Sequence, residues 1–152
     1  MEVHFYQLQH SPLPKVLFDL SQRCLQNGWR VNIVAPSAAQ RIDDMLWSFD
    51  DAGFFPHATD QDKRAKDQPV LISETESKAN DPSALIVTGM GRIEENAVGD
   101  YARVSLVFDG RNPDQLQNAR SLWKTLTGAG IAAKFWSQED GPWAMKAASD
   151  AK

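Results

Sequence analysis

The sequence predicts a three-layer α/β domain with a mainly parallel sheet and helices on both faces. Short runs rich in β-branched and aromatic residues alternate with longer segments whose apolar residues recur every three or four positions. The chain has 152 residues, 42% of them hydrophobic, which suits one domain with a single core. We therefore expect residues 1–152 to form a single α/β domain, with 147–152 as a frayed tail at its C-terminus.

Six short apolar runs are predicted to be strands. They are too short for helices, and turn-forming residues bound them. They cover residues 3–8, 30–35, 69–72, 85–88, 104–108 and 131–136. A polar link joins the third run to the fourth without room for a helix, so at least one neighbour in the sheet is expected to be irregular or antiparallel.

Three helices are predicted from their periodicity and their ends. The first opens at Leu13 and ends before Gly28, and the second covers residues 38–49 with Ser37 as its N-cap. The third follows Asn112 and runs to Thr127. Residues 58–68 carry many charges and no hydrophobic side chain larger than alanine, so they are expected to form a surface loop.

Charge and composition exclude several classes of protein. The formal net charge of −4 argues against the broad basic surface of a nucleic-acid-binding domain, so no direct nucleic-acid partner is expected. Binding of single strands through Trp29, Trp123 and Trp136 is disfavoured for the same reason, because no cationic stripe accompanies these rings. The sequence has neither a membrane-length apolar run nor a signal-peptide pattern at its N-terminus, so we expect a cytoplasmic protein without a membrane partner.

Catalytic and cofactor signatures are also missing. The first predicted strand is followed by no glycine-rich phosphate loop, and the three histidines have no metal-ligand spacing. The single cysteine, Cys24, lies in a helical pattern and is assigned to packing. We therefore expect no cofactor, no metal and no catalytic residue. The alternative is a small α/β enzyme that handles a phosphorylated substrate with the turn at 89–92 and either Arg103 or Asp109.

The most informative cluster is Arg120, Trp123 and Lys124 in the third helix. Residues three and four apart are neighbours on a helix, so two cations flank one large ring. Such a surface suits an acidic peptide that ends in an aromatic residue and a free carboxylate. The alternative is a solvated amphipathic helix whose tryptophan points into the core.

An ordered series of motifs extends over nearly the whole chain. The motifs are Phe5-Tyr6-x-Leu8, Gly28-x-Arg30-Val31, Arg41-Ile42-Asp43-x-x-Leu46-Trp47-Ser48-Phe49, Phe54-x-Pro56-His57, Pro69-Val70, Arg103-Val104 and Ala119-Arg120-x-x-Trp123-Lys124 before Gly130. Together they resemble the chi subunit of bacterial DNA polymerase III, a component of the clamp-loader assembly. The loop 60–67 and the segment 141–146 depart from the family pattern.

The resemblance implies a Rossmann-like domain without a nucleotide site and a non-enzymatic adaptor in DNA replication. It implies two protein partners, the acidic C-terminal tail of single-stranded DNA-binding protein (SSB) and the psi subunit or another component of the clamp loader. Carried over residue by residue, the tail site maps to Arg120, Trp123 and Lys124. The psi-interface candidates are Trp47, Phe54, Pro56 and His57, although a core position for Trp47 and Phe54 is equally compatible with the sequence.

Overall fold

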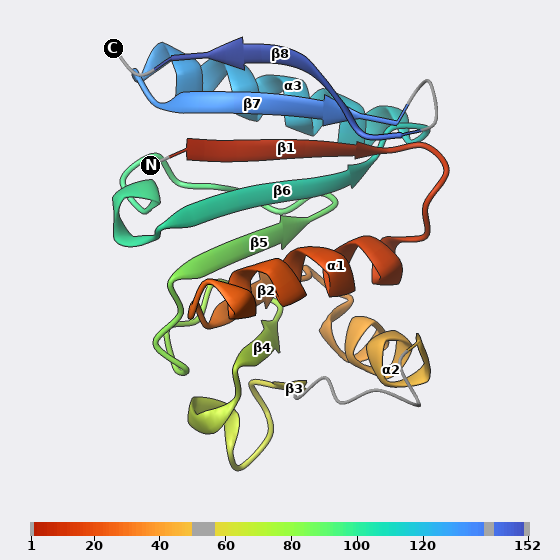
Figure 1. The fold of residues 1–152 in the computed structure, drawn as a ribbon, viewed down its shortest axis with the longest axis vertical. Coiled ribbons are helices and arrows are strands. Elements are labelled where there is room, and N and C mark those ends of the chain that lie inside the picture. Colours follow the sequence, from red (N-terminus) through yellow and green to blue (C-terminus); the bar gives the residue numbers. More distant parts are fainter. Residues whose placement is uncertain (1, 50–56, 139–141, 151–152) are drawn as a thin grey trace.

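The computed structural model describes residues 2–49, 57–138 and 142–150, and within them one eight-stranded sheet spans the molecule (Figure 1). The strands are β1 (Glu2–Leu8), β2 (Val31–Val34), β3 (His57–Thr59), β4 (Val70–Ser73), β5 (Ala84–Thr88), β6 (Arg103–Asp109), β7 (Ala132–Ser137) and β8 (Ala144–Ser149). Their order across the sheet is β3-β4-β2-β5-β6-β1-β7-β8. Every neighbouring pair is parallel except β7 and β8. The predicted mainly parallel α/β fold is confirmed.

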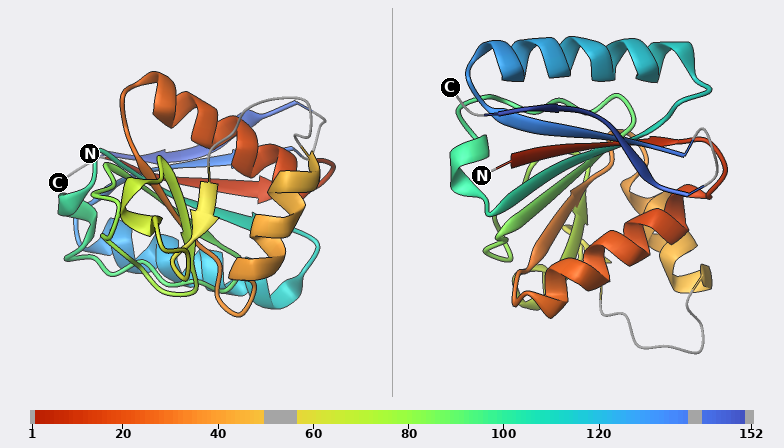
Figure 2. Two further views of the ribbon diagram at one scale, coloured as in Figure 1. Left: turned by 90° about the horizontal axis from the view of Figure 1, so that it is seen from below. Right: turned by 45° about the horizontal axis from the view of Figure 1, so that its top comes forward.

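Helices cover both faces of this sheet (Figure 2). The helices α1 (Leu13–Gln26) and α2 (Ala39–Phe49) lie on one face, and α3 (Pro113–Gly128) lies on the other. Pro14 lies in the first turn of α1, and Gly28, with φ of +77°, follows its end, as predicted. The N-cap role of Ser37 was wrong, because its φ of +58° places it in a left-handed turn while α2 begins at Ala39.

Two further predictions are corrected at the edges of the sheet. Residues 58–68 are not wholly a loop, because residues 57–59 pair in parallel with β4 and a 3-10 turn, η1 (Ala65–Asp67), follows. The frayed tail was also wrong for residues 147–149, because they pair with β7 as part of β8, with Ser149 opposite Ala133. In both places, backbone pairing with a stronger neighbouring strand compensates for a sequence with little strand preference.

The middle of the sheet is regular although no helix joins β4 to β5. Both strands run parallel to β2, on either side of it, so the predicted antiparallel neighbour lies instead at the C-terminal edge. Buried amides replace the missing helix: Asn32 Nδ2 donates to Ser73 Oγ at 2.9 Å, and Asn80 Nδ2 donates to the Val31 carbonyl at 3.1 Å. These bonds satisfy backbone and side-chain groups that the connection would otherwise leave unpaired.

Two buried clusters form the core, one on each side of the sheet. The side beneath α1 and α2 contains Leu17, Ile33 and Leu46, all fully buried. The side beneath α3 contains Phe5 and Leu126, together with side chains from the connection after β5, which includes the 3-10 turn η2 (Val98–Asp100). That connection covers part of the sheet that a helix would cover in a regular βαβ unit. No helix in the described part of the chain is long and apolar enough to cross a membrane.

Candidate functional site

The helix α3 presents the predicted cationic cluster. Its first turn is capped by Asn112, whose Oδ1 accepts from the backbone N–H groups of Asp114 and Gln115 at 3.0 and 3.2 Å. Two turns further on, Arg120 and Lys124 are exposed. Among the described residues, neither has a carboxylate within ion-pair distance. Both cations are therefore available to an external anion.

Trp123 lies between the two cations and is half-buried. Its ring meets Phe5 edge-on at a centroid distance of 5.4 Å and Phe135 at 6.0 Å, both from the sheet below. The hydroxyl of Thr127 donates to the Trp123 carbonyl at 2.7 Å. The ring thus packs partly in the core, as expected for an amphipathic helix whose tryptophan points inward. Its exposed part adjoins the two cations on the helix surface.

The second predicted cluster lies on the opposite face of the sheet, where α2 meets β3. Trp47 is 50% exposed and stacks on His57 at a centroid distance of 4.0 Å. His57 is itself buried, and its Nε2 lies 3.2 Å from the Asp43 carbonyl and 3.7 Å from Asp43 Oδ1. His57 therefore supports the Trp47 ring from beneath. Phe54 and Pro56 lie outside the described residues.

The second cluster contains one acidic residue with a shifted pKa, Asp43. Burial raises the pKa of its carboxyl above the ordinary value, and the nearby His57 opposes that shift. Its Oδ1 atom is buried without a hydrogen bond from any described residue. The cluster thus combines an exposed tryptophan with a largely buried carboxyl that interacts with Trp47 and His57.

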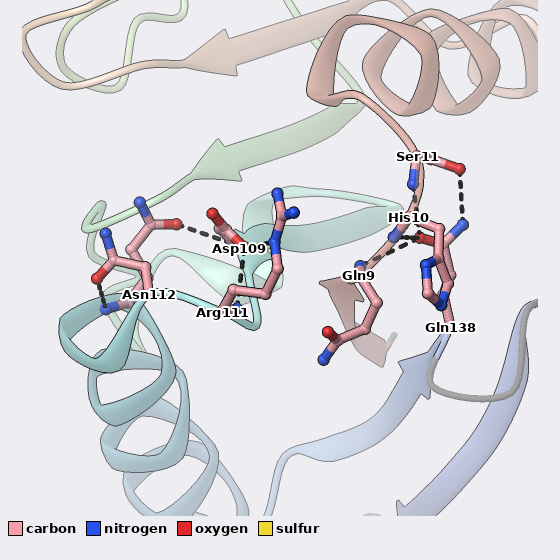
Figure 3. A network of polar contacts seen from close by, with 8 residues as sticks. Gln9, His10, Ser11, Asp109, Arg111, Asn112 and Gln138 are labelled. Carbon is pink, nitrogen blue, oxygen red and sulfur yellow. Dashed lines mark hydrogen bonds and ion pairs between the residues drawn. The ribbon is translucent and has the colours of Figure 1, made fainter.

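The polar network at the carboxyl ends of β1, β6 and β7 has two separate parts (Figure 3). Gln138 Oε1, after β7, accepts from the backbone N–H groups of residues 9–11 at 3.3 to 3.4 Å, and its Nε2 donates to Ser11 Oγ at 2.8 Å. At the end of β6, Asp109 Oδ1 accepts from the backbone N–H of Arg111 at 2.9 Å and from its guanidinium at 3.3 Å. In nucleotide-binding folds, backbone N–H groups after the first strand bind phosphate. Here the corresponding groups, at residues 9–11, donate to the Gln138 side chain.

A cleft of about 390 Å³ adjoins this network and is lined by Gly89, Arg41 and Asp109 among others. Part of the enzyme alternative is brought together there, because the turn at 89–92 and Asp109 both line the cleft. Arg103 and Asp109 stand at opposite ends of β6, which at about 3.3 Å per residue places them about 20 Å apart. Of these residues, Gly89, Met90 and Asp109 therefore share the cleft, and Arg103 does not line it.

No other catalytic chemistry is evident among the described residues. They contain no group of three or more His, Cys, Asp or Glu residues that could hold a metal ion. Cys24 is buried, and burial raises the pKa of its thiol to about 11, so the thiol is protonated at neutral pH. Its assignment to packing agrees with its position in the core beneath α1.

Comparison with protein families assigns the chain. The profile of the family described as DNA polymerase III chi subunit, HolC, matches residues 1–134. The chain belongs to the DNA polymerase III chi subunit family. The resemblance inferred from the motifs is confirmed, and the protein is a non-catalytic accessory subunit of DNA polymerase III rather than an enzyme. A comparison with curated protein sequences finds no match.

Sequence reasoning placed the α3 cluster correctly on one helical surface but missed two features of the chi-family domain. It did not identify the burial of His57, which depends on packing between α2 and β3. It also gave no role to Gln138, which joins the loop after β7 to the loop after β1. A lone polar residue after a strand carries no pattern that distinguishes it from any other loop residue.

Proposed function

We propose that this chi-family protein is a replication adaptor that binds the acidic C-terminal tail of SSB at Arg120, Trp123 and Lys124. The observation that carries the proposal is the exposure of two cations, without ion-pair partners among the described residues, beside a half-buried tryptophan. Arg120 would bind the terminal carboxylate with two parallel hydrogen bonds. Lys124 would attract the acidic side chains, and the exposed part of Trp123 would contact the terminal aromatic ring.

The proposal includes a link to the clamp loader through the psi subunit. Trp47 supports this part, because a half-exposed tryptophan held in place by a buried ring is the kind of anchor found at the centre of protein interfaces. Phe54 and Pro56 remain sequence-based candidates for this interface, and His57 supports the Trp47 ring. The adaptor is proposed to act in the cytoplasm, and membership of a DNA polymerase III subunit family supports this location.

A titration tests the tail site. A labelled peptide with the acidic tail of SSB and a free terminal carboxylate is added to the protein, in parallel with the same peptide amidated at its C-terminus. We expect saturable binding of the free acid and at least tenfold weaker binding of the amide, because the amide is neutral and has only one acceptor oxygen for the guanidinium. Equal affinity for the two peptides would exclude recognition of the carboxylate.

A separate experiment tests the psi contact. Trp47→Ala is compared with Met45→Ala, a half-buried neighbour on the same helix, for retention of psi in a complex formed from purified proteins. Loss of psi with Trp47→Ala and retention with Met45→Ala is expected. Retention of psi by both folded variants would show that the interface does not include Trp47.

A further inference from the structure

One part of the sheet has no helix over it. The helix α1 crosses in front of β5 and β2, whereas no helix formed by the described residues lies over β6, β1 and β7 on that side (Figure 1). Side chains alternate along these strands, so Phe5 and Phe135 face α3 while Tyr6 and Trp136 face the α1 side. Aromatic side chains therefore line this face, where Tyr6 is buried and Trp136 is partly exposed.

The rings on this surface are held in fixed orientations. Trp136 lies nearly parallel to Tyr6, with an interplanar angle of 11° and a centroid distance of 6.5 Å, and to His4, at 19° and 6.2 Å. Trp136 Nε1 donates to His4 Nδ1 at 3.2 Å, which places the imidazole proton on Nε2, 3.2 Å from Glu2 Oε1. Burial lowers the pKa of His4, so the neutral ring that accepts this hydrogen bond is favoured.

A fourth ring forms a wall beside these three. Trp143, which precedes β8, meets Tyr6 edge-on at 5.4 Å with an interplanar angle of 82°. Trp143, Trp136 and Tyr6 line a groove of about 280 Å³, whose other side is formed by α1. We call this space the aromatic groove. Its walls at Trp136 and Trp143 lie beyond residue 134, where the family match ends.

Two arginines stand at one end of the aromatic groove. Arg23 of α1 lines both the groove and an adjoining cleft of about 130 Å³, and Arg103 of β6 lines that cleft. In the described part of the chain, neither arginine has a carboxylate within ion-pair distance, whereas Glu2 lies 3.4 Å from Lys134 and Asp19 lies 2.9 Å from Lys15. The nearby acids are thus paired with lysines, and the guanidinium groups are free to bind an anion.

We infer that the aromatic groove binds single-stranded nucleic acid, with a base against Trp143 and Trp136 and a phosphate at Arg23 and Arg103. Planar rings stack on bases of any sequence, and guanidinium groups bind phosphate oxygens with two hydrogen bonds. A nucleic-acid strand alternates bases with phosphates, and the surface offers an aromatic compartment beside a cationic one. The sequence has no cationic stripe, so it predicts no nucleic-acid contact. The fold, however, brings Arg23 of α1 and Arg103 of β6 to the same cleft.

Fluorescence anisotropy with a labelled oligothymidylate tests this inference on the full chain at two salt concentrations. We expect saturable binding that weakens as salt rises, and Trp143→Ala to weaken it about fivefold or more through loss of stacking. Arg23→Ala should weaken binding and reduce the slope of log affinity against log salt by about 0.7, the value for one phosphate contact on a single strand. Trp143→Phe should restore most of the affinity, because it keeps an aromatic face.

The matched control is Lys124→Ala, which removes one exposed cation from α3 on the opposite face of the sheet. It should leave oligonucleotide affinity unchanged, and Arg23→Ala should leave binding of the SSB tail peptide unchanged. The two sites can therefore fail independently. Absence of saturable binding at low salt, or equal affinity of folded Arg23→Ala and Lys124→Ala proteins, would overturn the inference. So would loss of peptide rather than oligonucleotide binding in Arg23→Ala, which would assign the groove to an acidic peptide.

Discussion

Replacing Arg120 with alanine should weaken binding of the SSB tail strongly and leave the domain folded. The side chain is exposed and, among the described residues, has no ion-pair partner, so the change should alter the free energy of unfolding by no more than about 0.5 kcal/mol. In the complex, the same guanidinium is proposed to bind a carboxylate. A hydrogen bond to a charged group contributes about 1.5 to 3 kcal/mol, which corresponds to a loss of about tenfold to a hundredfold in affinity.

Lys124→Ala is the matched variant, since it removes the same charge one turn along α3. An ammonium group near solvent is mobile and screened, so its loss should reduce affinity less than the loss of Arg120 does. The difference between wild type and Lys124→Ala should shrink as salt rises. Arg120→Ala should keep most of its effect, because a bidentate contact depends on geometry as well as charge.

The assay is a titration of labelled tail peptide into wild type and both variants at low and moderate salt. Circular dichroism and the thermal midpoint report whether each variant is folded. Unchanged affinity in a folded Arg120→Ala protein would refute the reasoning and remove α3 as the tail site. A larger effect of Lys124 than of Arg120 would retain the helix but reject the proposed carboxylate contact.

Three further predictions concern stability and reactivity. Leu126→Ala should lower the free energy of unfolding by about 2 to 5 kcal/mol, because removal of this fully buried side chain would leave a cavity beneath α3. Chemical denaturation measures this change, and a decrease of less than about 1 kcal/mol would contradict the packing. Because burial raises the pKa of Asp43 in the folded state, the native protein holds its proton more tightly than the unfolded chain, and stability should fall as pH rises from the ordinary aspartate pKa to the raised one. The stability of Asp43→Asn relative to wild type should therefore be greater at pH 7 than below pH 3.8, and identical pH profiles would disprove the shift. Cys24, with its pKa of about 11, should resist alkylation at pH 7.5 until denaturant unfolds the chain, and rapid modification of the native protein would show the thiol to be accessible.

The sequence carried enough information for the central elements of the fold but not for its edges. The runs at β1, β6 and β7 contain branched or aromatic residues and are bounded by turns, so local pattern alone identifies them. The edge strand β8 reads Ala-Met-Lys-Ala-Ala-Ser, which has little strand preference, and its conformation comes from pairing with β7. The three-residue β3 is likewise a strand because it lies beside β4.

The same division applies to the candidate sites. Arg120, Trp123 and Lys124 lie within five residues of one another on one helix, so their proximity follows from helical geometry. The burial of His57 beneath Trp47 depends on how β3 packs against α2, which no local pattern encodes. The aromatic groove depends on contacts between residues as far apart as Arg23, Arg103 and Trp143, so only the fold brings them together.

The placement of α2 and α3 on opposite faces of the sheet has a consequence for assembly. A peptide bound at Arg120 and a protein docked on Trp47 would be separated by the whole thickness of the sheet, so they would not compete for space. The buried strands between them are closely packed, and no described residue belongs to both clusters. The simplest expectation is therefore that the two bind independently, with the affinity for the SSB tail the same whether or not psi is present. Such independence would let one small domain keep hold of the clamp loader while it exchanges one SSB tail for another.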